Sequence, residues 1–178
     1  MKEADVRILP RSYHFVNLGC PKNLIDAERT AAGLEAAGWR RAPSIGEAGL
    51  IVVTTCAFIS MAEEESIQVI LEVAGNKSPS QRLAVLGCLV SREGALLESL
   101  LPEVDLFLGV EEMEQLPARL SEEGEGSTPA DGPADRGRVF FTPPHIAYLK
   151  IAEGCSNHCT YCTIPSIRGE LRSREGAG

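Results

Sequence analysis

The sequence predicts an α/β fold built on a parallel β-sheet. Over the first 120 residues, short apolar segments alternate with longer segments in which apolar residues recur at helical spacing. One short segment, Leu50–Thr55 (LIVVTT), is β-branched and apolar enough to be buried on both faces, as strands of parallel sheets are. These two observations favour parallel strands joined by crossover helices.

The first strand is predicted over Tyr13–Leu18 (YHFVNL), where Gly19 and Pro21 mark its end. Asn23, with Asp26 three residues later, is the expected cap of a helix that runs to Ala37. Gly38 then stands where a glycine commonly ends a helix.

The second strand, Leu50–Thr55, leads into a helix predicted over Ser60–Ala74. Glutamates at 63, 64 and 65 suit its N-terminus, because negative charge there is favourable to the helix dipole. Its apolar stripe, Ile67, Ile70, Leu71 and Ala74, is interpreted as core packing. The remaining elements expected in this half are strands over Leu83–Leu86 and Val104–Leu108 and helices over Arg92–Leu101 and Glu111–Leu120.

A composition change separates this half from the end of the chain. Residues 121–137 (SEEGEGSTPADGPADRG) are dense in Gly, Pro and acidic residues and have no apolar residue larger than alanine. We interpret them as a flexible linker between a domain over residues 1–120 and a second unit that begins at residue 138. Strands are predicted in that unit over Arg138–Thr142 and Ile146–Ile151.

The bulk composition is that of a globular protein, with 44% hydrophobic and 24% charged residues. No apolar stretch approaches the ~20 residues of a membrane span, and the first residues lack the apolar core of a signal peptide. A cytoplasmic location is expected. The net charge of −8 argues against general nucleic-acid binding. Arg168, Arg172 and Arg174 form a local basic group, interpreted either as a solvated turn or as an anion site.

Three of the six cysteines, Cys155, Cys159 and Cys162, lie in EGCSNHCTYC with C-x3-C-x2-C spacing. Three thiolates this close repel one another unless a metal takes up their charge, and one loop of this spacing can wrap three corners of a cubane cluster. A structural zinc site commonly uses four ligands, and His158 is badly placed to be the fourth. An iron–sulfur cluster is the favoured interpretation, with zinc and free thiols as alternatives.

The other three cysteines, Cys20, Cys56 and Cys88, are far apart in sequence, but each directly follows a predicted strand. In a parallel sheet the carboxyl ends of the strands meet at one edge, where ligands bind. We therefore expect a shared metal site. Gly19 and Gly87, each just before a cysteine, would let the backbone approach a bulky group. The alternative is three separately buried cysteines that act as small apolar residues.

At these residues the sequence resembles the methylthiotransferase family of radical-SAM enzymes. The resemblance is carried by NLGCPKNLIDAE (17–28), TTCAFI (54–59), GCLVSRE (87–93) and KIAEGCSNHCTYCTIPSIRGELRSR (150–174). It covers nearly all of the chain except the linker. It implies a flavodoxin-like N-terminal domain followed by the start of a radical-SAM (β/α) barrel over residues 138–178. GCPKN is most like the branch that modifies an aspartate of ribosomal protein S12, and tRNA-modifying branches are the alternative.

The resemblance also implies ligands and cofactors. Cys20, Cys56 and Cys88 would hold an auxiliary [4Fe–4S] cluster, and Cys155, Cys159 and Cys162 would hold the radical-SAM cluster. Tyr161 would lie near the adenine of S-adenosylmethionine, unless it is a simple packing aromatic. Electrons would come from a donor such as flavodoxin or ferredoxin. The expected reaction splits S-adenosylmethionine reductively, takes hydrogen from an unactivated carbon, and delivers sulfur and a methyl group.

Two further expectations concern the chain as a whole. At 178 residues it leaves no room for a complete barrel, so we expect an N-terminal portion of such an enzyme, inactive by itself. The competing interpretations are a cluster-binding electron-transfer module and a zinc-stabilised interaction domain. The enzyme is favoured because each set has three cysteines, which leaves one iron open, whereas ferredoxin clusters use four.

Overall fold

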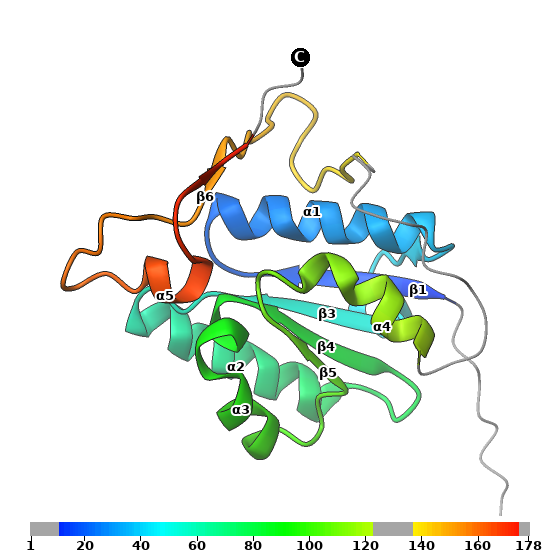
Figure 1. The fold of residues 1–178 in the computed structure, drawn as a ribbon. Helices are drawn as coiled ribbons and strands as arrows, with labels where there is room; N and C mark the ends of the chain where they lie inside the picture. Colours follow the sequence, from blue (N-terminus) through cyan, green and yellow to red (C-terminus); the bar gives the residue numbers. More distant parts are fainter. Residues whose placement is uncertain (1–10, 123–136, 175–178) are drawn as a thin grey trace, which may run out of the picture.

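The computed structural model describes residues 11–122 and 137–174 and contains the predicted parallel sheet. Five parallel strands lie in the order β2-β1-β3-β4-β5, and a short antiparallel pair, β6 and β7, stands apart (Figure 1). The strands are β1 (Ser12–Asn17), β2 (Arg40–Arg41), β3 (Leu50–Thr55), β4 (Arg82–Gly87), β5 (Leu106–Leu108), β6 (Ala152–Glu153) and β7 (Arg172–Ser173). The helices are α1 (Pro21–Ala36), α2 (Ser60–Asn76), α3 (Cys88–Leu100), α4 (Leu116–Glu122) and α5 (Ile164–Arg168), with 3₁₀ turns at Ile45–Glu47 and Met113–Gln115.

Strand β3 is the centre of the sheet and is buried along its whole length. It pairs in parallel with β1 on one side, where Asn17 lies opposite Thr54, and with β4 on the other, where Thr55 lies opposite Gly87. The three strands therefore end within one residue of the same level. Whatever follows them in sequence emerges at one edge.

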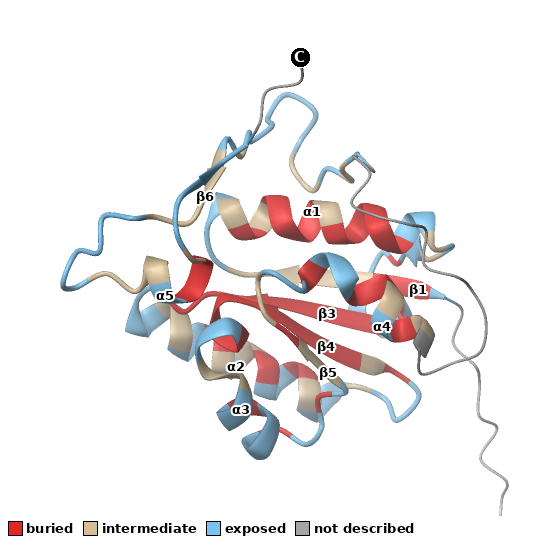
Figure 2. Ribbon diagram, in the orientation of Figure 1, coloured by how far each residue is buried: buried red, intermediate tan, exposed pale blue. Residues whose placement is uncertain are grey.

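Helices cover both faces of the sheet. Helices α1 and α4 pack on one face, where Leu34 and Leu116 join a buried cluster with Val52 (Figure 2). Helices α2 and α3 pack on the other, where Ile70 and Leu89 lie in a second cluster. This two-sided cover is why β3 carries apolar side chains without alternation. In the predicted α2 stripe, Leu71 is the exception, because it is exposed.

Helix α1 ends as predicted but does not begin as predicted. Gly38 has a φ of +85°, and its N–H donates to the carbonyl of Glu35. The N–H of Trp39 donates to the carbonyl of Leu34, and these two hydrogen bonds form a Schellman motif. The N-cap residue is Cys20, and Pro21 occupies the first turn. The prediction of Asn23 as cap was wrong, because this residue lies inside the helix with its side chain fully buried.

Several boundaries also differ from the predicted ones. Helix α3 begins at Cys88 rather than Arg92, since its first turn starts directly at the end of β4 and the helix kinks at Glu93. The helix expected over Glu111–Leu120 is divided into a 3₁₀ turn and α4. Strand β2 was missed because two exposed arginines carry no strand pattern.

The strands predicted over Arg138–Thr142 and Ile146–Ile151 are absent. The segment instead runs along α1 (Figure 1), where Glu28 of that helix accepts from the backbone N–H of Phe141 and Lys22 donates to the carbonyl of Ala152. Regular pairing begins only at β6, which lies antiparallel to β7. Most of the predicted linker, residues 123–136, lies outside the described residues. Within the described part of the chain, no helix has the length and apolar character needed to cross a membrane.

Gly87 provides a test of how tightly the sheet edge is built. It has a φ of +105°, and a Cβ added there would stand 3.0 Å from the carbonyl oxygen of Thr55. Gly87→Ala should therefore lower the free energy of unfolding by about 1–3 kcal/mol, measured by urea denaturation. The matched control is Gly75→Ala, in open space within α2, which should raise it by about 0.5–1 kcal/mol. Equal stabilities of the two variants would contradict this account of the edge.

Candidate metal centre

Cys20, Cys56 and Cys88 follow three neighbouring strands, as the sequence predicts. Cys20 caps α1 after β1, Cys56 directly follows β3, and Cys88 is the first residue of α3 after β4. Cys56 and Cys88 are buried, whereas Cys20 is exposed. The parallel register thus brings three thiols from distant parts of the sequence to one edge of the sheet.

Asn23 ties this edge together from inside α1. Its side-chain N–H groups donate to the carbonyls of Leu18 (3.2 Å) and Thr55 (2.7 Å), the residues that follow β1 and end β3. Its Oδ1 atom lies 3.4 Å from the thiol of Cys88. One buried amide therefore joins the ends of β1 and β3 to the third cysteine.

The backbone at this edge is closely packed. Gly19 has a φ of +92°, and a Cβ added there would stand 2.9 Å from the Cβ of Cys56. The hydroxyl of Ser66 accepts the backbone N–H of Cys56 at 3.1 Å, which fixes that residue against α2. Only glycine fits at position 19, and its small size brings the loop of Cys20 close to Cys56.

The thiol of Cys88 lies next to a cation. Burial raises the pKa of this thiol, the neighbouring Arg168 lowers it, and the thiols of Cys56 and Cys20 raise it again, with a net increase. The guanidinium of Arg168 donates to Cys88 Sγ at 3.4 Å and to Asn23 Oδ1 at 2.5 Å. The C-terminal segment thereby reaches the three-cysteine edge directly.

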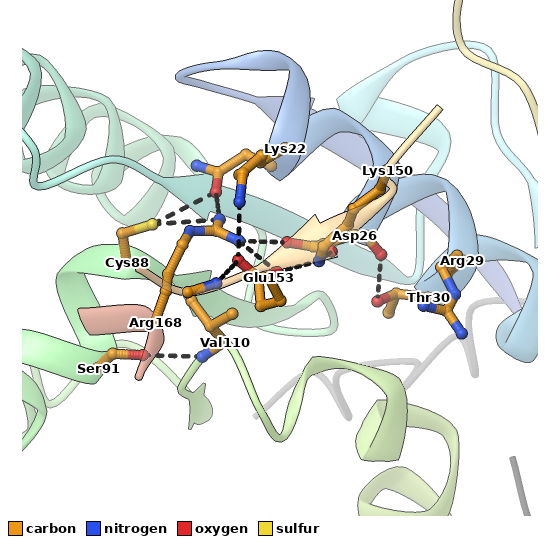
Figure 3. Close-up of polar contacts among 12 residues, drawn as sticks. Lys22, Asp26, Arg29, Thr30, Cys88, Ser91, Val110, Lys150, Glu153 and Arg168 are labelled. Atoms are coloured by element: carbon orange, nitrogen blue, oxygen red, sulfur yellow. Dashed lines mark hydrogen bonds and ion pairs between the residues drawn. The ribbon is translucent and has the colours of Figure 1, made fainter. Parts of the chain in front are cut away.

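Arg168 is only 2% exposed and is the centre of a charge network (Figure 3). Its guanidinium donates to Asp26 of α1 and to Glu153 of β6, both at 3.0 Å. Asp26 also accepts from Lys150 at 2.5 Å, and Glu153 accepts from Lys22 at 3.2 Å. Burial alone would raise the pKa of Glu153, but the hydrogen bond from Lys150 and the charge of Arg168 lower it to about 2.

A second contact holds the same segment nearer the other end of α1. Glu28 is fully buried, and its carboxylate accepts from the guanidinium of Arg138 and, at 2.8 Å, from the backbone N–H of Phe141. Phe141 also packs on Phe15. Two acidic residues on one helix thus bind a segment that follows them by more than a hundred residues.

The second cysteine set is more open. Cys159 is exposed, and Cys155 and Cys162 are half-buried. His158 has a φ of +47° and faces Glu170 at 3.0 Å, so it does not turn toward the cysteines. Tyr161 is exposed. Its expected place beside adenine stays a prediction.

Neither set is closed around a metal position, since no three Cys, His, Asp or Glu side chains of residues 11–122 and 137–174 are close enough to share one ion. The donors at the sheet edge nevertheless fit a cluster by their chemistry. Three thiols converge there, Gly19 lets the backbone approach Cys56 more closely than a residue with a Cβ could, and a buried cation adjoins one thiol. The ligand assignments stay predictions.

The sequence did not indicate the charge network. Arg168 was grouped with Arg172 and Arg174 as a solvated turn or an anion site, and both interpretations were wrong for Arg168, which pairs with carboxylates in the interior. The sequence signal that could have indicated the network was the pair of acidic residues Asp26 and Glu28 within the predicted helix. Carboxylates buried there would need positively charged partners from elsewhere in the chain.

Comparison with known proteins identifies the part of the chain that holds the sheet and the first three cysteines as one family region. Residues 12–109, just over half of the chain, match the family described as "Uncharacterized protein family UPF0004". The chain belongs to this family. The matched residues begin with β1 and end just after β5, so the UPF0004 region coincides with the five-stranded sheet and holds Cys20, Cys56 and Cys88.

Curated relatives of this UPF0004 member are named as methylthiotransferases. "Ribosomal protein uS12 methylthiotransferase RimO" of Syntrophus aciditrophicus is 47% identical over 92% of this chain, and that of Syntrophomonas wolfei is 42% identical over 90%. The protein of the same name from Pelotomaculum thermopropionicum is 44% identical over 89%. The chain spans about two-fifths of the length of these relatives. The resemblance to methylthiotransferases is confirmed as a resemblance to their N-terminal portion.

The buried Glu28 provides a test of segment docking. In Glu28→Gln, Arg138 loses its charged partner, so trypsin should cleave after Arg138 about tenfold faster, because cleavage requires local release. The rate is measured by mass spectrometry of timed digests. The control, Glu111→Gln, removes an ion pair with Arg172 in which both side chains are largely exposed, and should leave the rate unchanged. Cleavage at the wild-type rate in Glu28→Gln would show that this contact does not hold the segment.

Proposed function

We propose that this chain is the cluster-binding portion of a radical-SAM methylthiotransferase that modifies an aspartate of ribosomal protein uS12. One observation carries the proposal. Three cysteines converge at the carboxyl edge of the sheet, and a segment with three more cysteines docks on the same edge through Arg168. The identity of 39–47% to relatives named uS12 methylthiotransferase supports the choice of acceptor.

The two cysteine sets have separate roles in this proposal. Cys20, Cys56 and Cys88 hold one [4Fe–4S] cluster, and the loop of Cys155, Cys159 and Cys162 holds the other. Three cysteines in each set leave one iron without a protein ligand, which is the position at which a small molecule binds. When bound, the clusters and S-adenosylmethionine supply reductive cleavage and sulfur delivery.

The chain's own residues position and protect this chemistry. Asn23 fixes the ends of β1 and β3 and faces Cys88, so the first set is held by a buried hydrogen-bond network. Asp26 and Lys22 of α1 hold the segment that carries the second set, through ion pairs with Arg168 and Glu153. Tyr161 offers an exposed aromatic face to the adenine of S-adenosylmethionine. An electron donor such as flavodoxin or ferredoxin completes the system.

Iron and acid-labile sulfide per chain test the ligand assignments. After anaerobic reconstitution, wild type should hold about eight irons, and each triple-alanine variant, one lacking Cys20, Cys56 and Cys88 and the other lacking Cys155, Cys159 and Cys162, about four. Each variant is the matched control of the other. Zinc in place of iron in all three proteins would overturn the proposal, and four irons lost only with the first set would remove the second cluster from it.

The acceptor is tested separately in a chimera. Residues 11–174 of this chain replace the matching segment of the Syntrophus aciditrophicus relative, and the product is incubated with S-adenosylmethionine, reductant and uS12. Mass spectrometry of uS12 peptides should show a methylthio group on one aspartate, absent in either triple-alanine variant. Modification of tRNA adenosine with unmodified uS12 would favour the alternative acceptor, and no modification of either by an iron-loaded chimera would contradict the proposed activity.

A further inference from the structure

Arg168 belongs to the segment of the second cysteine set and contacts a cysteine of the sheet edge. It follows Cys162 by six residues in sequence and lies at the end of α5. Its side chain turns back into the interior, where it contacts Cys88, Asp26 and Glu153 (Figure 3). It also donates a hydrogen bond to Asn23. A flexible surface residue would not be held by four partners on three different elements, α1, α3 and β6.

The burial of this arginine needs a physical reason. Taking a guanidinium out of water is costly, and the cost is offset only when its donors are satisfied by well-placed acceptors. Two carboxylates, an amide oxygen and a thiol supply those acceptors here. Loss of the arginine would leave Asp26 and Glu153 with fewer counter-ions in a buried position. Docking of this segment is therefore specific to arginine at position 168.

The charges around the edge are unequal. Lys22, Lys150 and Arg168 contribute three positive charges, and Asp26 and Glu153 contribute two negative ones, so this network has a surplus of one positive charge. Cysteine binds a metal as the thiolate, which is anionic. Arg168 places one of these positive charges 3.4 Å from Cys88 Sγ.

We propose that Arg168 is a positioning residue that couples the two cysteine sets. Its buried guanidinium fixes the loop of Cys155–Cys162 on the three-cysteine edge and contacts the Cys88 thiol of the first set. Because such coupling is reciprocal, filling of the first set strengthens docking of the loop, and docking strengthens retention of metal by the first set. The coupling between metal retention and docking rests on the proposed cluster at Cys20, Cys56 and Cys88. The docking of the loop by Arg168 does not depend on that cluster.

Hydrogen exchange of the metal-free full chain tests the docking. The reporter peptides span residues 152–173, which include the N–H of Cys155 bonded to Gly169 and that of Gly169 bonded to Pro165. In Arg168→Gln, exchange in these peptides should be about tenfold faster, with no change in β3 and β4. Arg168→Lys should be intermediate, because lysine keeps the charge but not the forked donors.

Arg172→Gln is the matched control, since Arg172 lies on the same segment but its side chain is exposed and forms an ion pair with the exposed Glu111. Its exchange should equal that of wild type. Wild-type exchange over 152–173 in Arg168→Gln would overturn the docking role. If fast exchange in β3 and β4 shows that Arg168→Gln is unfolded throughout, the test uses Arg168→Lys instead. Faster exchange than wild type over 152–173 in that variant would then support the docking role, and wild-type exchange would overturn it.

Retention of iron tests the coupling. In a background where Cys155, Cys159 and Cys162 are alanine, only iron of the first set is counted. Transfer of that iron to a chelator should be about tenfold faster in Arg168→Gln than in Arg172→Gln, and iron loading should slow exchange over 152–173. Equal transfer rates would overturn the coupling but not the docking. No iron in any form would overturn both the coupling and the proposed function, whereas the exchange comparison would still decide the docking role.

Discussion

The parallel register of β1, β3 and β4 is the constraint on which the rest of this molecule depends. Parallel strands must be joined by crossovers, so the residue after each strand enters a loop at the same edge of the sheet. In this chain Cys56 and Cys88 directly follow β3 and β4, and Cys20 lies three residues after the end of β1. A slip of β1 or β4 by one residue would exchange the faces of every side chain and carry a cysteine away from the other two.

Buried charge on α1 determines where the C-terminal segment lies. Asp26 and Glu28 are on a helix that already packs one face on the sheet, and their carboxylates lie beneath the segment that begins at residue 137. Buried ion pairs contribute little net stability, because desolvation offsets much of the attraction. Their effect is positional: Arg138, Lys150 and Arg168 each meet a particular carboxylate, so the segment has one register along the helix.

These two constraints meet at Cys88. This residue begins α3 at the end of β4, and its thiol contacts both Asn23 of α1 and Arg168 of α5. Cys88 thereby joins the carboxyl edge of the sheet, which strand pairing builds, to the C-terminal segment, which the ion pairs with α1 position. In chemical terms, the site combines three thiols, a side-chain type that suits soft metals, with a buried cation 3.4 Å from one of them.

The sequence alone determined the parallel sheet, the burial of β3 on both faces and the convergence of three cysteines at one edge, because strand periodicity and strand-to-loop order are local properties. It also predicted Gly38 as the end of α1, since a left-handed residue after a helix favours glycine. Asn23, Arg168 and the strands expected over 138–151 were misread, because their conformations depend on partners distant in sequence. Only the tertiary structure decided that Asn23 would brace the sheet edge and that Arg168 would be buried. Burial of a polar side chain depends on whether distant residues supply its hydrogen-bond partners, and no local pattern records that.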